Sequence, residues 1–173
     1  MKIPLTKGQV AIVDDEDHER VSSLKWYAHK AYSKWYALHS VYRRGTTCEH
    51  LTMQNFVTGE VPAGHYVDHI NGDGLDNRKC NLRIANKSQN KANAKKQIWV
   101  SGKPTTSKYK GVYWNKRISK WNASIKVNYK KIFIGHYHDE IKAALAYNKA
   151  AIENFGEFAN LNVINRPTDG RTE

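Results

Sequence analysis

The residues best suited to chemistry lie between Tyr66 and Arg83, in the stretch YVDHINGDGLDNRKCNLR. A carboxylate and an imidazole stand side by side at Asp68 and His69, where a short run of strand-forming residues ends. The following NGDGLDN has two glycines and several Asx residues, which is typical of a tight turn. The segment Asn81–Ala85 can return as a second strand. The order of these segments predicts a hairpin with an acid and a base at the end of its first strand.

A helix is expected directly after this hairpin, because Asn86 is a good N-cap and NKSQNKANAKK contains helix formers. Asn86, Asn90 and Asn93 would then share one face of the helix. If that face packs against the hairpin, Asn90 approaches Asp68 and His69. One carboxylate oxygen and one amide oxygen form a hard, incomplete ligand set, which leaves positions on Mg²⁺ or Mn²⁺ for waters and a phosphate. A neutral histidine beside that ion can take a proton from a water aimed at phosphorus.

Other chemistries fit the same stretch less well. A calcium loop needs ligands at alternating positions, and Ile70 and Leu75 occupy such positions. A zinc site needs more ligands than the pair His69 and Cys80. Plain turn chemistry stays open as an alternative, because turns of the NGDGLDN kind are common.

The charge of the chain is concentrated in one segment. The formal net charge is +12, and residues 77–138 hold sixteen Lys and Arg with no Asp or Glu. The remainder holds twelve basic and sixteen acidic residues, so all the excess positive charge lies in this segment. Aromatic residues interrupt the basic run, which favours a folded surface over a basic tail. A folded basic surface with interleaved aromatics predicts a nucleic acid as the partner.

The chain continues through a stretch rich in Gly, Pro, Ser and Thr, KQIWVSGKPTTS, which is typical of a linker. A second folded unit follows, in which Trp121, Ala123 and Ile125 alternate with polar residues as in a strand with one buried face. Strands on either side of it and a helix from the cap Asp139 to Gly156 complete a three-stranded antiparallel sheet backed by one helix.

Cysteine content and hydropathy indicate the cellular compartment in which the protein is expected. Cys48 and Cys80 are too few for a disulfide framework and are expected to be free thiols in a reducing interior. No apolar run is long enough for a membrane span, and the first ten residues lack the apolar core of a secretory signal. We therefore expect a cytoplasmic protein with no membrane partner.

From Val67 to Asn93, the Asp-His pair, NGDGLDN, NLR and SQN resemble the HNH family of nucleases and its ββα-metal motif. The resemblance implies one divalent ion, Mg²⁺ or Mn²⁺, held by Asp68 and Asn90. It also implies that His69 is the general base and that Asn81 holds the loop between the strands. Arg83 is a further candidate, as a phosphate clamp. The chain departs from the family pattern at MQNFVTG, where Gln54 and Asn55 replace the usual His and Arg.

The second unit resembles the AP2 DNA-binding domain through YKGVYW, IGHY, EIKAALAYNKAA and FGEFANLN. In that family the exposed face of the sheet enters the major groove, so the resemblance implies base contacts from strand side chains. The candidate DNA contacts in this unit are Lys110, Tyr113, Asn115, Arg117, Ser124 and Lys126, with Lys130 as a phosphate contact. On the helix after the hairpin and just beyond it, Lys87, Lys91 and Lys95 are expected to follow the DNA backbone.

Together these features predict an α+β protein with a ββα-metal motif, an N-terminal β-rich extension and a C-terminal AP2-type sheet packed on one helix. The expected divisions are an HNH domain at 1–95 (a β-rich extension over 1–66 and a core over 67–95), a linker at 96–107, an AP2-like domain at 108–162 and a flexible tail at 163–173. The combination looks like an HNH–AP2 homing endonuclease of phages or bacteria, acting on double-stranded DNA as a monomer or dimer. The alternative is a DNA-binding regulator that has lost cleavage, which Gln54 favours and the Asp-His and Asn residues oppose. An RNA-binding or structural protein would explain the charge but not the spacing of those residues.

Overall fold

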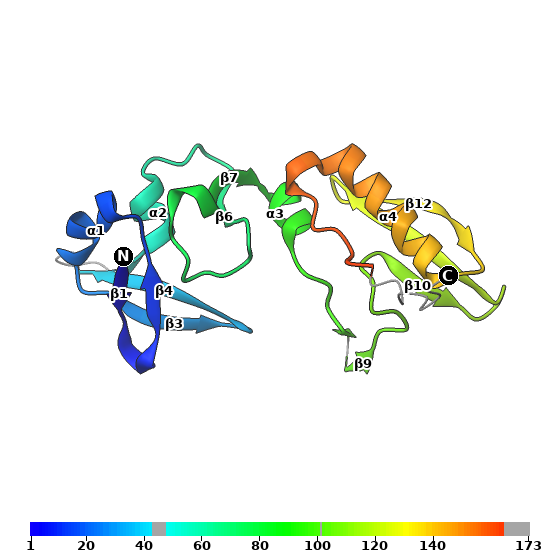
Figure 1. Cartoon of the computed structure of the whole chain (residues 1–173), viewed down its shortest axis with the longest axis horizontal. Coiled ribbons are helices and arrows are strands. Elements are labelled where there is room, and N and C mark those ends of the chain that lie inside the picture. The colour runs from blue at the N-terminus through cyan, green and yellow to red at the C-terminus, as the bar shows by residue number, and fades with distance from the viewer. Residues whose placement is uncertain (43–47, 101, 165–173) are drawn as a thin grey trace, which may run out of the picture. The chain divides into compact units, whose positions relative to one another are not determined.

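The structure, a computed structural model, describes residues 1–42, 48–100 and 102–164 (Figure 1). The chain divides into two compact units, Met1–Asn90 and Lys91–Glu173. Each unit has its own apolar core, as expected for domains of this size. In the described ranges no helix combines the length and apolar character needed to cross a membrane.

Unit 1 opens with a β-rich region. In chain order its elements are β1 (Lys2–Pro4), η1 (Thr6–Gly8), β2 (Val10–Ile12), α1 (Asp15–Ser22), β3 (Tyr27–Ala31), β4 (Lys34–Val41), β5 (Glu49–Thr52) and α2 (Met53–Thr58). Strands β3, β4 and β5 form an antiparallel sheet in sequence order, and β1 pairs with β2. The sequence KWYA occurs twice, at Lys25–Ala28 and Lys34–Ala37, and the hairpin of β3 and β4 pairs Ala28 of the first copy with Ala37 of the second. The core beneath these elements contains the buried Val13, Val21 and Met53.

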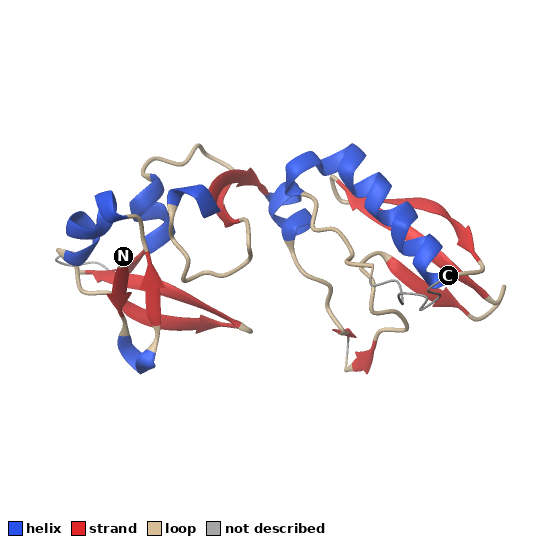
Figure 2. Cartoon of the chain, in the orientation of Figure 1, coloured by secondary structure: helices blue, strands red, loops and turns tan. Residues whose placement is uncertain are grey.

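The hairpin predicted around the Asp-His pair follows in the same unit, and the predicted helix begins there and extends past Asn90 into unit 2. Strand β6 (His65–His69) pairs with β7 (Leu82–Asn86), and the 3-10 turn η2 (Lys79–Asn81) and helix α3 (Lys87–Asn93) complete the order (Figure 2). The side chain of Asn86 accepts hydrogen bonds from the backbone N–H groups of Ser88 and Gln89, both at 2.9 Å. Gln89 in turn accepts from the N–H of Asn86 at 2.8 Å. This reciprocal capping fixes where α3 begins and hence where Asn90 lies.

Unit 2 contains the predicted sheet of three strands and one helix. Its strands are β8 (Trp99–Val100), β9 (Lys103–Pro104), β10 (Val112–Asn115), β11 (Lys120–Val127) and β12 (Lys130–Tyr137), followed by α4 (Glu140–Phe155) and η3 (Gly156–Phe158). Strands β10, β11 and β12 are antiparallel in that order, and α4 packs on one face of them (Figure 1). The cap Asp139 accepts from the N–H of Lys142 at 2.7 Å, and Gly156 ends the helix with a φ of 51°.

The polar positions of β11 are less exposed than simple alternation predicts. Asn122 and Ser124 are buried at 4% and 9% exposure, although they point away from the α4 side of the sheet. Asn122 accepts a hydrogen bond from Nδ1 of His136 at 2.7 Å, and Ser124 lies opposite Phe133. The register shifts between Ala123 and Ser124, which changes how β12 covers this region of β11. Side chains of the neighbouring strand therefore shield the centre of this face.

The first and last described segments of unit 2 are joined by hydrogen bonds. The backbone N–H of Asn160 donates to the carbonyl of Ala92 at 3.3 Å, and its side-chain amide donates to the carbonyl of Asn93 at 3.0 Å. The ammonium of Lys110 donates to the carbonyls of Ala92 and Ala94, at 2.5 and 2.6 Å. These bonds satisfy carbonyls at the C-terminal end of α3 that the helix itself leaves without partners.

Candidate active site

Asp68, His69 and Asn90 line a single pocket in unit 1. Its volume is about 410 Å³, and its lining residues are Lys34, Tyr36, Thr52, Gln54, Asn55, Val61, His65, Tyr66, Val67, Asp68, His69, Gly72 and Asn90. Asp68 and His69 are the last two residues of β6, and Asn90 is the middle residue of the short helix α3. The hairpin and the capped helix thus bring a carboxylate, an imidazole and an amide from distant positions in the sequence to one cavity.

His69 is held in one orientation beneath the turn. Its Nε2 lies 3.2 Å from Oδ1 of Asn77, a side chain with 0% exposure. Because an amide oxygen only accepts, the Nε2 of the neutral ring carries the proton and the lone pair is on Nδ1. Burial lowers the pKa of His69 below 6.5, and the contact with Asn77 and the charge of Asp68 offset some of this shift. At neutral pH the imidazole is therefore uncharged and able to accept a proton.

Asp68 is paired with Arg83, its partner in the β6–β7 register. The Nε and Nη2 atoms of Arg83 both lie 3.1 Å from Oδ2 of Asp68. The two side chains are only 11% and 7% exposed, so this is an ion pair largely removed from water. Arg83, the candidate phosphate clamp, thus pairs with Asp68, the candidate metal ligand. This pairing offsets the cost of burying the carboxylate of Asp68.

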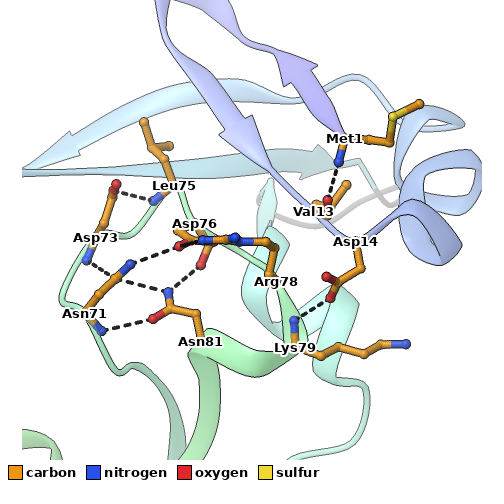
Figure 3. Close-up of polar contacts among 10 residues, drawn as sticks. All are labelled: Met1, Val13, Asp14, Asn71, Asp73, Leu75, Asp76, Arg78, Lys79 and Asn81. Carbon is orange, nitrogen blue, oxygen red and sulfur yellow. Dashed lines mark hydrogen bonds and ion pairs between the residues drawn. The ribbon is translucent and has the colours of Figure 1, made fainter.

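The turn between β6 and β7 is a network of its own polar side chains (Figure 3). The side chain of Asn81 accepts from the N–H of Asn71 at 3.0 Å and donates to the side chain of Asn71 and to the carbonyl of Asp76. Asp76 accepts two hydrogen bonds from Arg78, and Asp73 accepts from the N–H of Leu75 at 3.0 Å. Two of the acids in this stretch therefore shape the turn, while the third, Asp68, lines the pocket.

The β-rich region of unit 1 holds this turn in place. The N–H of Ile12 donates to the carbonyl of Leu75 at 2.8 Å, and the N–H of Asn77 donates back to Ile12 at 2.7 Å. Asp14 accepts from the N–H of Lys79 at 2.7 Å (Figure 3). The first strands of the chain thus contribute to the support for the pocket, because they fix the segment that carries Asn77.

The donor atoms in the pocket fit a hard divalent cation better than zinc. Among the described residues no group of three or more His, Cys, Asp or Glu side chains gathers as a metal cluster. The pocket instead brings together one carboxylate, at Asp68, and the amide of Asn90. Such an oxygen set suits Mg²⁺ or Mn²⁺, which keep several waters and take further oxygens from a phosphate.

The upstream positions that differ from the family pattern also lie at the pocket. Gln54 and Asn55 line it, and Oε1 of Gln54 is buried without a hydrogen-bond partner among the described residues. His50 does not take the place of the usual histidine, because its Nδ1 contacts the hydroxyl of Tyr27 at 3.0 Å and its side chain is outside the pocket lining. Helix α2 thus presents Gln54 and Asn55 to the pocket, and glutamine stands at the position of the usual histidine.

The predicted DNA contacts of unit 2 fall into different environments. Strand register places Tyr113, Asn115, Ser124 and Lys126 on the face of the sheet opposite α4, together with Lys131, whose ammonium lies 4.7 Å from the Tyr113 ring. Arg117 is exposed in the β10–β11 turn, and Ser124 is nearly buried. Lys130 is exposed but lies opposite Val127, which packs toward α4.

The lysines predicted to contact DNA also differ in exposure. Lys87, Lys91 and Lys95 are exposed, and the ammonium of Lys91 lies 5.3 Å from the ring of Tyr129. Lys110 differs from them because its ammonium is directed to the carbonyls at the end of α3, and burial lowers its pKa to about 8. Lys110 is therefore placed to support the fold of unit 2.

The sequence did not predict Lys34 and Tyr36, which reach the pocket from β4, or Asn77, which lies beside the His69 ring. The sequence does carry one signal for Lys34. From Arg20 to Cys48 there are six Lys and Arg and no Asp or Glu, a second acid-free segment outside residues 77–138.

These features define a nuclease of the HNH type, and comparison with known proteins supports that class. Residues 50–92 match a family model described as HNH endonuclease. The chain is 35% identical over 161 residues to an uncharacterized HNH endonuclease of Acanthamoeba polyphaga mimivirus, covering 91% of this chain and 77% of that protein. The chain therefore belongs to the HNH endonuclease family.

A second relative matches a shorter part of the chain. Protein 3.8 of Escherichia phage T7 is 33% identical over 76 residues, which cover 44% of this chain and 59% of that protein. No solved structure matches the chain.

Proposed function

We propose that the protein is a divalent-metal-dependent DNA endonuclease that hydrolyses a phosphodiester in the pocket of unit 1. The observation that carries this proposal is the meeting of Asp68, His69 and Asn90 around one pocket, with an uncharged imidazole beside two oxygen donors. The acid-free basic segment of residues 77–138 supports DNA as the substrate, because a polyanion needs cations along its path.

In this mechanism Asp68 and Asn90 would hold Mg²⁺ or Mn²⁺. When bound, the ion would supply charge stabilisation to the phosphorus centre and to the departing 3′ oxygen. His69, oriented through Nε2 by Asn77, would take a proton at Nδ1 from the attacking water. Asn81 would keep the turn in the shape that presents His69. Arg83 would share the carboxylate of Asp68 with the ion and hold it toward the pocket.

Unit 2 would bind duplex DNA, in the manner of an AP2 domain. Its open sheet face presents Tyr113, Asn115, Lys126 and Lys131, with Arg117 at one turn. Strand side chains of this kind can contact base edges in the major groove, while exposed lysines such as Lys87, Lys91, Lys95 and Lys130 contact phosphates. A site-selective grip joined to a cleavage pocket is the arrangement of a homing endonuclease, and this is the specific role that we propose.

Cleavage is tested by incubating the protein with supercoiled plasmid and Mg²⁺ or Mn²⁺. We expect relaxed circles to accumulate with time, because one pocket of this kind cuts one strand at a time. Chelation of the ion with EDTA should stop the reaction while leaving duplex binding measurable. Binding without any nicking in the presence of either ion would instead support a regulator that has lost cleavage.

The grip is tested by the salt dependence of duplex binding with the metal omitted. We expect the logarithm of the binding constant to fall steeply and linearly with the logarithm of salt concentration, since each lysine–phosphate contact releases counterions. Lys126→Met should weaken binding at low salt, whereas Lys149→Met, an exposed lysine on α4, should not. A nearly flat salt response would contradict a surface that follows phosphates.

A further inference from the structure

One wall of the pocket comes from the β-rich region of unit 1. Lys34 and Tyr36 are two residues apart on β4, so their side chains leave the strand on the same side. Both line the pocket together with Asp68, His69 and Asn90. The ring centroid of Tyr36 lies 6.2 Å from that of His69, which shows how close this strand comes to the imidazole.

The position of β4 against the turn is fixed by a glycine. Gly74 is buried, and a Cβ atom at this residue would lie 2.4 Å from the carbonyl oxygen of Trp35 and 2.6 Å from the Tyr36 ring. The turn backbone therefore lies directly on β4, with no room for a side chain between them. This contact sets the distance of Lys34 from the Asp68–His69 end of β6.

Lys34 presents an exposed positive charge at the pocket. It is the one lysine or arginine among the described residues that line the pocket, and Asp68 is the one acid. Asp68 is already paired with Arg83, whereas Lys34 has no ion-pair partner within the described ranges of the chain. The neighbouring sequence adds no acid from Arg20 to Cys48, so nothing nearby along β3 and β4 neutralises the ammonium.

A phosphodiester in this pocket has two non-bridging oxygens that need cationic partners. One partner would be the divalent ion that the oxygen donors Asp68 and Asn90 would hold. The ammonium of Lys34 comes from a different strand and is available to the other oxygen. Charge on these oxygens increases as the water attacks, so a cation here stabilises the transition state more than the ground state.

We propose that Lys34 is a substrate-contacting residue of the cleavage site, whose ammonium binds a non-bridging oxygen of the DNA phosphate that is cut. This inference rests on the proposed nuclease function and adds a residue from the β3–β4 hairpin to it. The hairpin then belongs to the catalytic apparatus as well as supporting the fold.

The test compares Lys34→Met and Lys34→Arg with Lys25→Met. Lys25 is an exposed lysine of the same acid-free segment that does not line this pocket, so it controls for the loss of one charge. Lys34→Met is expected to lower the kcat of plasmid nicking by about 100-fold, the effect of losing one preorganised donor, with a smaller change in KM. Lys34→Arg should retain most of the rate, and Lys25→Met should match the unmodified chain. Equal melting temperatures would show that all three variants are folded.

A second measurement does not depend on cleavage. In duplex binding without metal, Lys34→Met should reduce the salt slope by about 0.9, the value for one phosphate contact, and Lys25→Met should not. If the unmodified chain fails to nick DNA, the proposed function fails, and the salt slope alone decides the role of Lys34: a reduced slope supports the contact and an unchanged slope overturns it. If the unmodified chain nicks DNA and Lys34→Met nicks at the same rate, only the inference about Lys34 is overturned.

Discussion

Replacement of His69 by alanine is expected to reduce plasmid nicking by about 10³-fold while duplex binding stays unchanged. A positioned general base contributes roughly 10² to 10⁴ in rate, and the buried imidazole of His69 is the group in the pocket suited to that task. Binding is expected to persist because the exposed lysines of α3 and unit 2 are untouched. The rate is measured from the loss of supercoiled plasmid, and binding from the mobility of a labelled duplex in EDTA.

Asn77→Ala is the matched variant for this prediction. It keeps the imidazole but removes the amide oxygen 3.2 Å from Nε2, so the ring loses the contact that selects its tautomer. We expect a rate between those of the unmodified chain and His69→Ala. If His69→Ala retained a rate within a few-fold of the unmodified chain, another group would have to remove the proton, and the proposed mechanism would be wrong.

Arg83→Met is expected to lower the free energy of unfolding by about 3–5 kcal/mol, the usual cost of removing one partner of a buried ion pair. The reason is that the carboxylate of Asp68, 7% exposed, would lose the guanidinium that holds its Oδ2. Urea unfolding of the two proteins without metal measures the difference. A loss below about 1 kcal/mol would show that the pair is not effectively buried in solution.

The same variant tests whether a metal ion binds at Asp68. A cation that binds only the folded state raises stability through its binding free energy, and an uncompensated carboxylate binds it more strongly than a paired one. Mg²⁺ should therefore raise the melting temperature of Arg83→Met more than that of the unmodified chain. Arg78→Met is the control, because Arg78 pairs with Asp76 in the turn and is 46% exposed. Equal effects of Mg²⁺ on both variants would argue against a site at Asp68.

Local chemistry explains the elements of the fold that could be predicted from the sequence. The cap at Asn86, the cap at Asp139 and the glycine at 156 act within one turn of their own helices, and the structure confirms all three. The pairing of β6 with β7 was also predictable, because two strand-forming segments in succession, joined by a loop rich in Gly, Asn and Asp, commonly pair as a hairpin.

The features of the site and of unit 2 that could not be predicted depend on contacts between segments distant in the sequence. Lys34 and Asp68 are far apart in the sequence, and tertiary contacts such as the packing of Gly74 on β4 bring them to one pocket. The resemblance to the AP2 family implied a DNA contact at Lys110, and the contacts of its ammonium with carbonyls at the end of α3 could not be predicted from that resemblance. Alternation along β11 predicted an exposed polar face, whereas the register shift and β12 bury Asn122 and Ser124. Such outcomes depend on tertiary packing, which residue types and spacing do not determine.

The bonds between Asn160 and the end of α3 have a consequence for where unit 2 could be shortened. Two segments that are far apart in the sequence meet there, since the carbonyls of Ala92 and Asn93 accept hydrogen bonds from Asn160. Buried backbone groups that lose their partners are costly, and Ala92 and Asn93 are both buried. A truncation before Asn160 would therefore remove partners from the end of α3, which makes the segment around Asn160 an integral part of the folded unit.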